Sequence, residues 1–382
     1  MSIYLDYNAS SPIDDKVLDY MVNVYRSAYG NSDSRTHDHG DNARQIVEKA
    51  RKQVAALLKC QTSEVFFTSG ATESNNLAIL GLRDYSAEIG KNQIITTSIE
   101  HKAIIEATEQ LAKQGFRTDY VDPQKDGRIC AKDVLARVTE KTLLVSVMHA
   151  NNETGAIQPV LDIGKALSEK NILFHVDGTQ SCGKLVEEIQ NMQYDMLSLS
   201  AHKMYGPQGV GAIVLKRKKH KLPPVKAIMF GGPQEHRLRP GTVPVALVAG
   251  LGKACELVLC EHEKNIENCY KIKQELLKTL ESSGLEFVIN GDIKYSMPNT
   301  LNVCMKGISS EALMLASKQY CSLSNGSACT SSDYTPSHVL KAMGISDEDV
   351  LSSIRISWSG MQDKEKIISG FKKVLDIARN MV

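Results

Sequence analysis

The sequence predicts an α/β protein with a mostly parallel seven-stranded sheet, helices on both faces of that sheet, and a smaller α+β domain. Two observations lead to this fold class. Short runs of apolar, often β-branched residues alternate with amphipathic segments of helical length, and each run is apolar throughout. Strands that are buried on both faces have this continuous apolar character, which is typical of parallel sheets covered by helices. The chain of 382 residues, 42% of them hydrophobic, is long enough for such a core.

The elements follow in chain order. Apolar runs predict strands at residues 65–68, 93–97, 118–121, 143–149, 173–176, 196–200 and 211–215. Amphipathic segments between them predict helices, for example at residues 42–58, 102–114 and 163–170. The character then changes near residue 260: a long helix from 245 to about 280 precedes strands at 285–290 and 299–303, a helix at 310–318 and two closing helices. We therefore expect a large domain at 16–262 and a small domain made of 1–15 and 263–382.

Charge and cysteine content restrict the function. The 45 lysines and arginines against 44 aspartates and glutamates give a net charge of +1, which argues against direct nucleic-acid binding. The one basic run, residues 216–221, is predicted to be a solvated turn. Without a long apolar run or a secretory signal, no membrane contact is expected and a cytoplasmic location is predicted. Nine scattered cysteines without a CxxC pair predict no metal site, no disulfide framework and mostly buried thiols.

Three strand ends carry the candidate chemistry. In the segment 66–76, F-F-T-S-G-A-T-E-S-N-N, a strand meets a helix whose first N–H groups can hold a phosphate, although an ordinary capped turn is the commoner explanation. Asp177 follows the strand at 173–176, at the sheet edge where α/β proteins bind ligands, and helix capping is its alternative role. Lys203 follows the strand at 196–200; the alternative there is a structural lysine whose ammonium reaches solvent.

In combination these features suit one cofactor. Pyridoxal phosphate (PLP) requires a lysine for its aldehyde, an acid beside its pyridine nitrogen and a cradle for its phosphate. A lysine that is desolvated near another cation has a lowered pKa and reacts as an amine. The sequence therefore predicts PLP at Lys203, with Asp177 keeping the ring nitrogen protonated.

Eight motifs occur in order along the chain: Y-L-D-Y-N-A-S-S-P (4–12), F-T-S-G-A-T-E-S-N-N-L-A (67–78), I-E-H-K-A (99–103), M-H-A-N-N-E-T-G (148–155), H-V-D-G-T-Q-S (175–181), S-A-H-K-M-Y-G-P-Q-G-V-G-A (200–212), S-N-G-S-A-C-T-S (324–331) and S-S-I-R-I-S (352–357). Together they resemble the cysteine desulfurases, class V members of the fold-type I PLP-dependent transferases. The resemblance covers nearly the whole chain. It implies a homodimer that converts L-cysteine to L-alanine and passes the sulfur, held as a cysteine persulfide, to an acceptor protein.

The resemblance implies a role for each matching residue around the PLP ring. Lys203 would bind the aldehyde carbon, and Asp177 would pair with the ring nitrogen. Gln180 would donate a hydrogen bond to the ring oxygen. His101 would stack on the ring and shuttle protons, as an imidazole can near neutral pH.

The resemblance also implies the phosphate-binding and substrate-binding groups. The phosphate would be held by Ala71, Thr72, Ser200 and His202, with Thr242 reaching it from a second subunit. Asn152, at the edge of the cofactor, and Arg355 would bind the substrate carboxylate, the arginine as a planar fork.

Cys329 lies in a stretch of small and polar residues, S-N-G-S-A-C-T-S-S-D (324–333). The residues alone leave an ordinary surface-loop cysteine as the alternative. The resemblance implies that the thiolate of Cys329, the reactive form, takes the substrate sulfur and carries it away on a mobile loop. The motif is similar to that of the desulfurase subgroup with the longer catalytic loop. Cys321, eight residues earlier, is expected to be structural.

The chain departs from the family at residues 231–242, which read G-G-P-Q-E-H-R-L-R-P-G-T where the family has G-G-G-x-E-R-G-x-R-S-G-T. The differences that bear on the dimer contact and on Thr242 are Pro233, His236, Arg237 and Pro240.

Three further stretches are similar to the desulfurases that serve DNA phosphorothioation: S-R-T-H (34–37), R-P-G-T (239–242) and P-S-H-V-L-K-A-M-G (336–344). The chain also lacks the longer C-terminal tail of the housekeeping desulfurases after Val382. Iron–sulfur assembly and tRNA thiolation are the other destinations for the sulfur. A selenocysteine lyase or a class V aminotransferase on the same fold is the alternative enzyme, and a non-enzymatic scaffold is the alternative outside catalysis.

Overall fold

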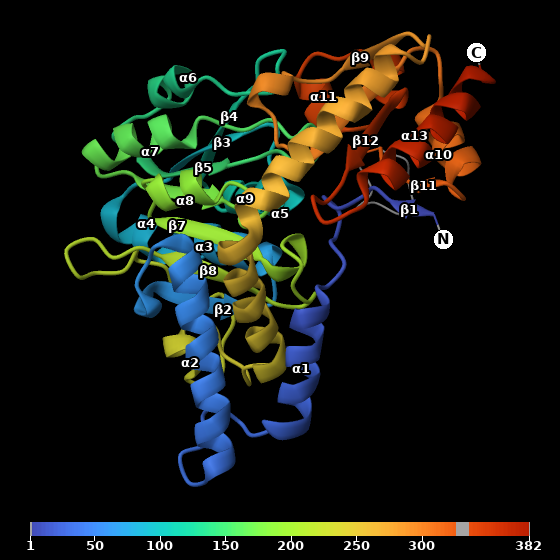
Figure 1. The fold of residues 1–382 in the computed structure, drawn as a ribbon. Helices are drawn as coiled ribbons and strands as arrows, with labels where there is room; N and C mark the ends of the chain where they lie inside the picture. Colours follow the sequence, from blue (N-terminus) through green and yellow to red (C-terminus); the bar gives the residue numbers. More distant parts are fainter. Residues whose placement is uncertain (1, 326–335, 382) are drawn as a thin grey trace.

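The computed structural model describes residues 2–325 and 336–381. A seven-stranded sheet with strand order β2-β8-β7-β6-β5-β3-β4 forms the centre of the larger part of the molecule (Figure 1). Its strands are β2 (Val65–Thr68), β3 (Gln93–Thr97), β4 (Arg117–Val121), β5 (Thr142–Met148), β6 (Leu173–Asp177), β7 (Met196–Ser200) and β8 (Gly211–Leu215). Only the pairs of β8 with β2 and β7 are antiparallel. The predicted, mostly parallel sheet is therefore confirmed, and every strand predicted for it belongs to it.

Helices cover both faces because successive side chains of a strand point to opposite sides. On one side Phe66 and Ile94 pack with α3 (Ala71–Leu80) and α5 (Lys102–Ala112). Their chain neighbours Phe67 and Ile95 belong to a core on the other side. The helices of that side are α2 (Asp38–Leu58), α7 (Val160–Glu169), α8 (Val186–Asn191) and the first part of α9 (Val245–Glu281). Two short helices, α4 (Arg83–Ile89) and α6 (Ala131–Ala136), complete this part of the chain.

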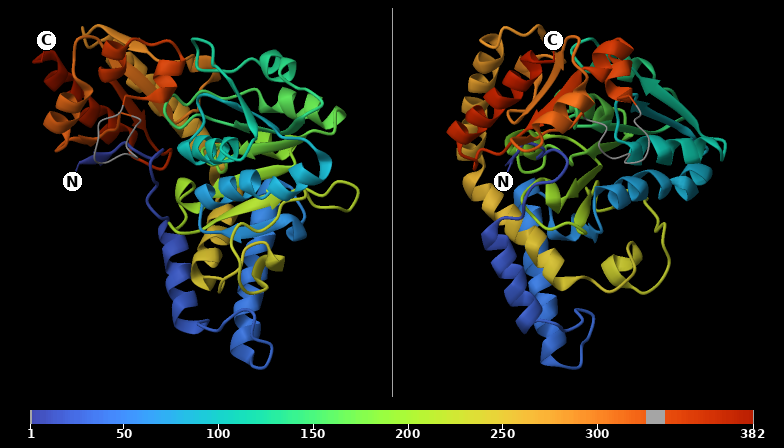
Figure 2. Two further views of the ribbon diagram at one scale, coloured as in Figure 1. Left: turned by 180° about the vertical axis from the view of Figure 1, so that it is seen from behind. Right: turned by 90° about the vertical axis from the view of Figure 1, so that its right-hand side faces the viewer.

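A second core surrounds a three-stranded antiparallel sheet with order β12-β10-β9 (Figures 1 and 2). Its strands are β9 (Phe287–Ile289), β10 (Thr300–Met305) and β12 (Ser353–Ser357). The second half of α9 packs on it with α10 (Ser310–Ser317) and α13 (Lys364–Arg379). At the other end of the chain, β1 (Ile3–Tyr4) pairs in parallel with β11 (Cys321–Ser322), which brings Leu5 into the same core.

The end of the chain differs from the prediction of two closing helices, which is wrong. The described residues 336–381 form three, α11 (His338–Ala342), α12 (Asp347–Leu351) and α13, with β12 between the last two. In β12 serine and arginine alternate with isoleucine, a pattern typical of a strand with one solvated face, yet all five residues are buried. The predicted domain boundary at residue 262 falls inside the continuous helix α9 and stays a prediction.

The helix α1 (Asp15–Ser27) lies beside α2 and the first half of α9, away from the second core (Figure 2). It buries Val17, Met21 and Val24, which recur at helical spacing. No helix in the described ranges 2–325 and 336–381 is both long and apolar enough to cross a membrane.

Candidate functional site

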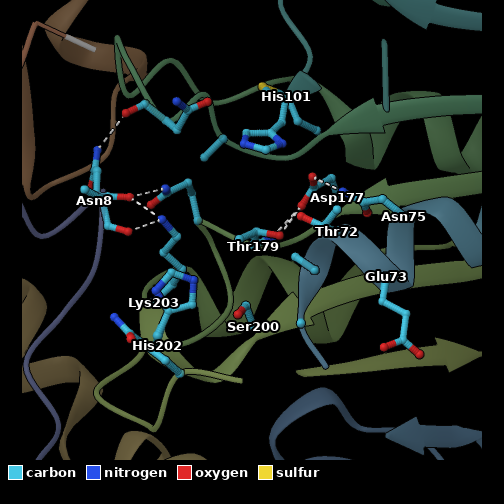
Figure 3. A pocket seen from close by; sticks show the side chains of 18 of the residues that line it. Asn8, Thr72, Glu73, Asn75, His101, Asp177, Thr179, Ser200, His202 and Lys203 are labelled. Atoms are coloured by element: carbon cyan, nitrogen blue, oxygen red, sulfur yellow. Dashed lines mark hydrogen bonds between the residues drawn. The ribbon is translucent and has the colours of Figure 1, made fainter. Parts of the chain in front are cut away.

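A cavity of about 490 Å³ lies where β5, β6 and β7 end (Figure 3). Ten of the residues predicted from the sequence line it: Ala71, Thr72, His101, Asn152, Asp177, Gln180, Ser200, His202, Lys203 and Arg355. Thr242 is exposed and is not among the lining residues of this cavity. Cys329 lies outside the described residues. Side chains that are up to 284 positions apart in the sequence therefore share one site.

The N-terminus of α3 forms one wall of the cavity. Gly70 precedes the helix with φ +153°, a conformation that L side chains rarely adopt. A side-chain carbon added at Gly70 would lie 3.7 Å from Ser200 Oγ, in van der Waals contact, so a side chain here would occupy part of the space between the two elements. The first N–H groups of a helix have no intrahelical acceptor, and Ala71 and Thr72 present theirs beside this space. The geometry fits a bound phosphate.

An ion pair neutralises the only carboxylate at this helix start. Glu73 accepts hydrogen bonds from Arg239 Nε at 2.9 Å and from the Ser69 amide at 2.8 Å. Burial alone would favour the neutral acid, but these bonds hold the pKa of Glu73 below its usual value. The negative charge of Glu73 is thus compensated by Arg239 and does not oppose an anion at the helix N-terminus.

Asp177, the last residue of β6, is 5% exposed and its carboxylate is held at both oxygens. Asn75 Nδ2 donates to one oxygen at 2.7 Å, and the Thr179 amide donates to the other at 2.9 Å, together with the Thr179 hydroxyl. These bonds fix the orientation of the carboxylate. A carboxylate held at this place fits the protonated nitrogen of a pyridine ring.

His101 lies above the space between Asp177 and Lys203 (Figure 3). It is the N-cap of α5, where its Nδ1 accepts a hydrogen bond from the Ala103 amide at 3.1 Å. Burial, aided by the charge of Lys203, lowers the pKa of His101, although Asp177 opposes the shift. The imidazole is therefore neutral at neutral pH, and because Nδ1 is an acceptor, the proton is on Nε2.

Lys203 follows β7 in a short 3-10 turn, and its ammonium contacts the N-terminal segment of the chain. Nζ donates to the carbonyl oxygens of Asn8 and Ala9, both at 2.6 Å. Next to it, burial and the charge of Lys203 lower the pKa of His202 to about 4, so the His202 imidazole is neutral. Asn8 belongs to the motif at residues 4–12, but no role was predicted for it. Its backbone contact with Lys203 could not be predicted from neighbouring residues in the sequence.

Arg355 lies at 2% exposure in the middle of β12. One terminal nitrogen donates to Asp6 Oδ1 at 2.6 Å and the other to the Asn152 carbonyl at 3.0 Å. Its Nε has no hydrogen-bond partner within the described residues. The guanidinium is thus fixed in orientation at the cavity wall, and each terminal nitrogen retains a second N–H, which fits a site for a carboxylate. Asp6, which lies in the motif at residues 4–12, had no predicted role.

Glu100, beside His101, is also missing from the predicted site. It is fully buried, and its Oε1 accepts hydrogen bonds from the Met148 amide at 2.9 Å and the Thr97 hydroxyl at 2.8 Å. Burial, with a smaller contribution from Asp177, raises the pKa of Glu100 to about 8. The carboxyl therefore ties the ends of β3 and β5 together as a largely neutral acid. The available signal was a glutamate three residues after an apolar strand.

His175 lies two residues before Asp177 in β6 and is expected to make the stability of the fold depend on pH. It is fully buried between Ser146 Oγ at 2.8 Å and Ser198 Oγ at 2.9 Å, and burial lowers its pKa to about 4. Between this value and the unfolded value near 6.5, the unfolded chain binds the extra proton, so stability falls as pH falls through this range. We expect His175 to make unfolding at pH 5 about 2 kcal/mol easier than at pH 7. Denaturant unfolding of His175→Gln should show a correspondingly smaller pH difference than the unchanged chain; an equal difference would contradict the assignment.

The segment that departs from the family contains three consecutive residues in left-handed conformation: Glu235, His236 and Arg237, with φ of 45°, 55° and 67°. The Glu235 carboxylate holds this turn through two bonds from Arg51, at 2.7 and 2.8 Å, and one from the Phe67 amide at 2.8 Å. The family sequence has glycine at the position of Arg237, where this backbone conformation carries no side-chain penalty.

Arg237→Gly is therefore expected to raise the free energy of unfolding by about 0.5–1 kcal/mol, since the left-handed conformation costs an L side chain more than glycine loses in entropy. Denaturant unfolding measures this directly. Lys125→Gly, at an exposed site without positive φ, is the control and should lower stability. A loss in both variants would contradict the strain at Arg237.

The described cysteines fall into three groups. Buried ones are Cys182, Cys255, Cys269, Cys304 and Cys321; Cys60 and Cys130 are half-buried, and Cys260 is exposed. The expectation of buried thiols is therefore wrong for Cys260. Burial raises the pKa of Cys321 to about 11, which keeps it as a thiol and agrees with a structural role.

Comparison with known proteins gives one family. The class V aminotransferase family matches residues 3–368. The cysteine desulfurases IscS of Anaeromyxobacter dehalogenans (strain 2CP-C) and Vibrio cholerae serotype O1 (strain M66-2) are each 40% identical to this chain. The first aligns over 367 residues, 96% of this chain and 89% of the relative; the second aligns over 370 residues, 96% and 90%.

Solved structures agree with this family. A NifS-like protein has a TM-score of 0.91 and 36% identity, with all of both chains covered. DndA from Streptomyces lividans has a TM-score of 0.81 and 39% identity over 92% of this chain and 98% of that one. SspA, solved in complex with cysteine, has a TM-score of 0.81 and 34% identity over 93% and 98%. This chain belongs to the cysteine desulfurases of the class V aminotransferase family.

Proposed function

We propose that this chain uses PLP attached at Lys203 to convert L-cysteine to L-alanine, and that the sulfur remains on Cys329 as a persulfide. The observation that carries the proposal is the shared cavity, which Lys203, Asp177 and the N-terminus of α3 line together. A lysine, a fixed carboxylate and an anion cradle are the three protein groups that PLP requires.

The residues of the cavity fit PLP group by group. Asp177 would pair with the pyridine nitrogen, and Gln180, whose Nε2 is its donor end, would contact the ring oxygen. The phosphate would be held by Ala71, Thr72, Ser200 and His202. When bound, PLP supplies an electron sink for negative charge that develops on the α-carbon of the amino acid.

The substrate is held by charge and hydrogen bonds. Arg355 would bind the cysteine carboxylate from the wall opposite the sheet, with the Asn152 side chain beside it. Because Asp6 and the Asn152 carbonyl already fix the guanidinium, little side-chain entropy is lost when substrate binds. His101, neutral and protonated at Nε2, would exchange protons on the side of the ring that it covers.

Cys329, whose role rests on its motif, would receive the sulfur. Its thiolate forms a bond to the substrate sulfur while the carbon–sulfur bond breaks, and the electron pair of that bond stays with carbon. A proton delivered to this carbon completes L-alanine. The products are therefore alanine and a persulfide on Cys329, with no external oxidant or reductant required.

A homodimer is part of the proposal. On α1 the face opposite the core exposes Leu18, Val22 and Tyr25, and Phe230 is 88% exposed on the segment that leads to Thr242. An exposed apolar surface of this kind is typical of a subunit interface. Thr242, exposed on one chain, would then reach the phosphate of its partner.

We expect the unchanged chain to elute in size-exclusion chromatography with light scattering at twice its mass of 42.0 kDa. Phe230→Asp should shift the population towards the monomer by at least about tenfold in dissociation constant, because it places a charge in the interface. Tyr270→Asp, at an exposed aromatic residue on α9, is the control. If the unchanged chain and both variants all eluted at the mass of a monomer, the dimer would be refuted.

The central experiment is incubation of the PLP-loaded protein with L-cysteine and a reductant, with alanine and sulfide measured together. Equal amounts of both are expected. A keto acid in place of alanine would identify an aminotransferase, and turnover of selenocysteine alone would identify a selenocysteine lyase. A colourless protein that yields neither product would identify a scaffold. The acceptor protein, the cytoplasmic location and a place in DNA phosphorothioation, iron–sulfur assembly or tRNA thiolation stay predictions.

A further inference from the structure

A buried lysine behind the cavity, Lys184, has no place in the proposed reaction. It is 8% exposed, and within the described part of the chain its ammonium makes one hydrogen bond, 3.4 Å long, to Gln180 Oε1. Burial and repulsion by Lys203 lower the pKa of Lys184 to about 8, and no carboxylate of the described chain contributes to its charge state. An ammonium group has three donor hydrogens, and burying it without an anion costs stability. If the only role of this position were to stabilise the fold, an apolar side chain would serve it better than a lysine.

Lys184 is connected to Lys203 through two acceptors. Gln180 Oε1 accepts from Lys184, so the opposite end of the amide, Nε2, donates to the Asn8 carbonyl at 2.9 Å. The same Asn8 carbonyl accepts from Lys203 Nζ at 2.6 Å (Figure 3). Both lysines therefore act on one short hydrogen-bonded chain at the cavity wall.

We propose that Lys184 is a positioning residue, which fixes the Gln180 amide with its donor end towards the cavity and holds a second positive charge beside Lys203. This inference rests on the proposed function. An amide side chain can present either oxygen or nitrogen, and only the N–H end stabilises an anionic ring oxygen. The nearby charge also disfavours a proton on the nitrogen of Lys203, which must react as an unprotonated amine.

The other titratable groups around Lys184 do not cancel its charge. They come from the turn after β6, from the segment after β7 and from α9: Cys182, Tyr205, His262 and Cys269. Burial raises the pKa of Cys182 and of Cys269, the latter to about 12, so both remain neutral thiols. Burial likewise raises the pKa of Tyr205, which stays a neutral phenol. None of these groups is an anion at neutral pH.

The test is a pH titration of the visible absorbance of the PLP-loaded protein, which reports the protonation of the nitrogen that joins Lys203 to PLP. Lys184→Met and Lys184→Gln both remove the charge, and the glutamine retains a donor towards Gln180. We expect both to raise the midpoint by about one pH unit, since a charge several ångströms away is removed from a poorly solvated site. Lys184→Arg should restore the midpoint of the unchanged chain.

Lys273→Met is the matched control. Lys273 is 2% exposed and burial lowers its pKa to about 8, but it donates to Ser296 and to the Met297 carbonyl and does not line the cavity. Its replacement should leave the midpoint unchanged. The inference would be overturned if both neutral Lys184 variants had the same midpoint as the control. It would also be overturned if both failed to fold while Lys184→Arg folded, because that result would show a structural role. Absence of any visible absorbance in the unchanged chain would instead refute the proposed function.

Discussion

Lys203→Ala is expected to remove the covalent attachment of PLP and to lower alanine formation from L-cysteine by at least about 10³-fold. Among the residues that the structure describes, Lys203 is the lysine that lines the cavity, with Asp177 on another part of its wall. Loss of the attachment removes both the reactive amine and a group that moves protons, and general acid–base groups alone contribute about 10²–10⁴-fold. The physical readout is borohydride reduction followed by mass spectrometry, which fixes PLP to the unchanged chain and leaves the variant unmodified.

Lys102→Ala supplies the control for that experiment. Lys102 is exposed and adjoins His101 at the start of α5, so its loss changes the local charge without touching the cavity wall. The control should retain borohydride labelling and most of its activity. If Lys203→Ala kept both the label and the activity, another lysine would carry PLP and the assignment of Lys203 would fail.

Cys329→Ser is expected to abolish sulfide release in the presence of a reductant, by about 10³-fold or more, while PLP and L-cysteine still bind. A serine hydroxyl is a poor nucleophile towards sulfur, because it is not ionised near neutral pH as a thiol is in part. Absorbance changes on addition of L-cysteine report binding, and sulfide measures transfer. The two readouts separate loss of the acceptor thiol from loss of the cofactor site.

Cys260→Ser is the matched control because Cys260 is the exposed cysteine among the described residues. It should release sulfide at the unchanged rate, and mass spectrometry of the chain after reaction without reductant should find the extra sulfur on the Cys329 peptide. Normal sulfide release by Cys329→Ser would exclude the persulfide assignment and favour a different class V reaction.

The strands and the groups at their ends were predictable because both depend on neighbouring residues. Apolar runs near Val145 and Leu197 predict buried strands, and the positions of Asp177 and Lys203 directly after such runs predict the edge of the sheet to which they belong. The parallel arrangement then places both groups at the same edge. That reasoning predicts a PLP site from the local pattern.

Contacts between distant parts of the chain were not predictable in this way. The Asn8 carbonyl accepts a hydrogen bond from Lys203, 195 positions away, and Asp6 accepts one from Arg355, 349 positions away. No periodic pattern in the sequence predicts either contact. The strand β12 was not among the predicted strands, although serine and arginine alternate in it with isoleucine as in a half-solvated strand; burial of its polar face depends on neighbours that are distant in the sequence.

The sequence by itself determined the sheet and the order of its strands along the chain, and it predicted the candidate reactive groups, because hydrophobic periodicity and residue chemistry are local properties. Only the tertiary structure decided how those groups are ionised and oriented. The neutral imidazole of His101, the protonated acid of Glu100 and the direction of the Gln180 amide depend on burial and on partners brought together by folding. Desolvation and hydrogen bonding act through space, and a one-dimensional pattern does not contain those distances.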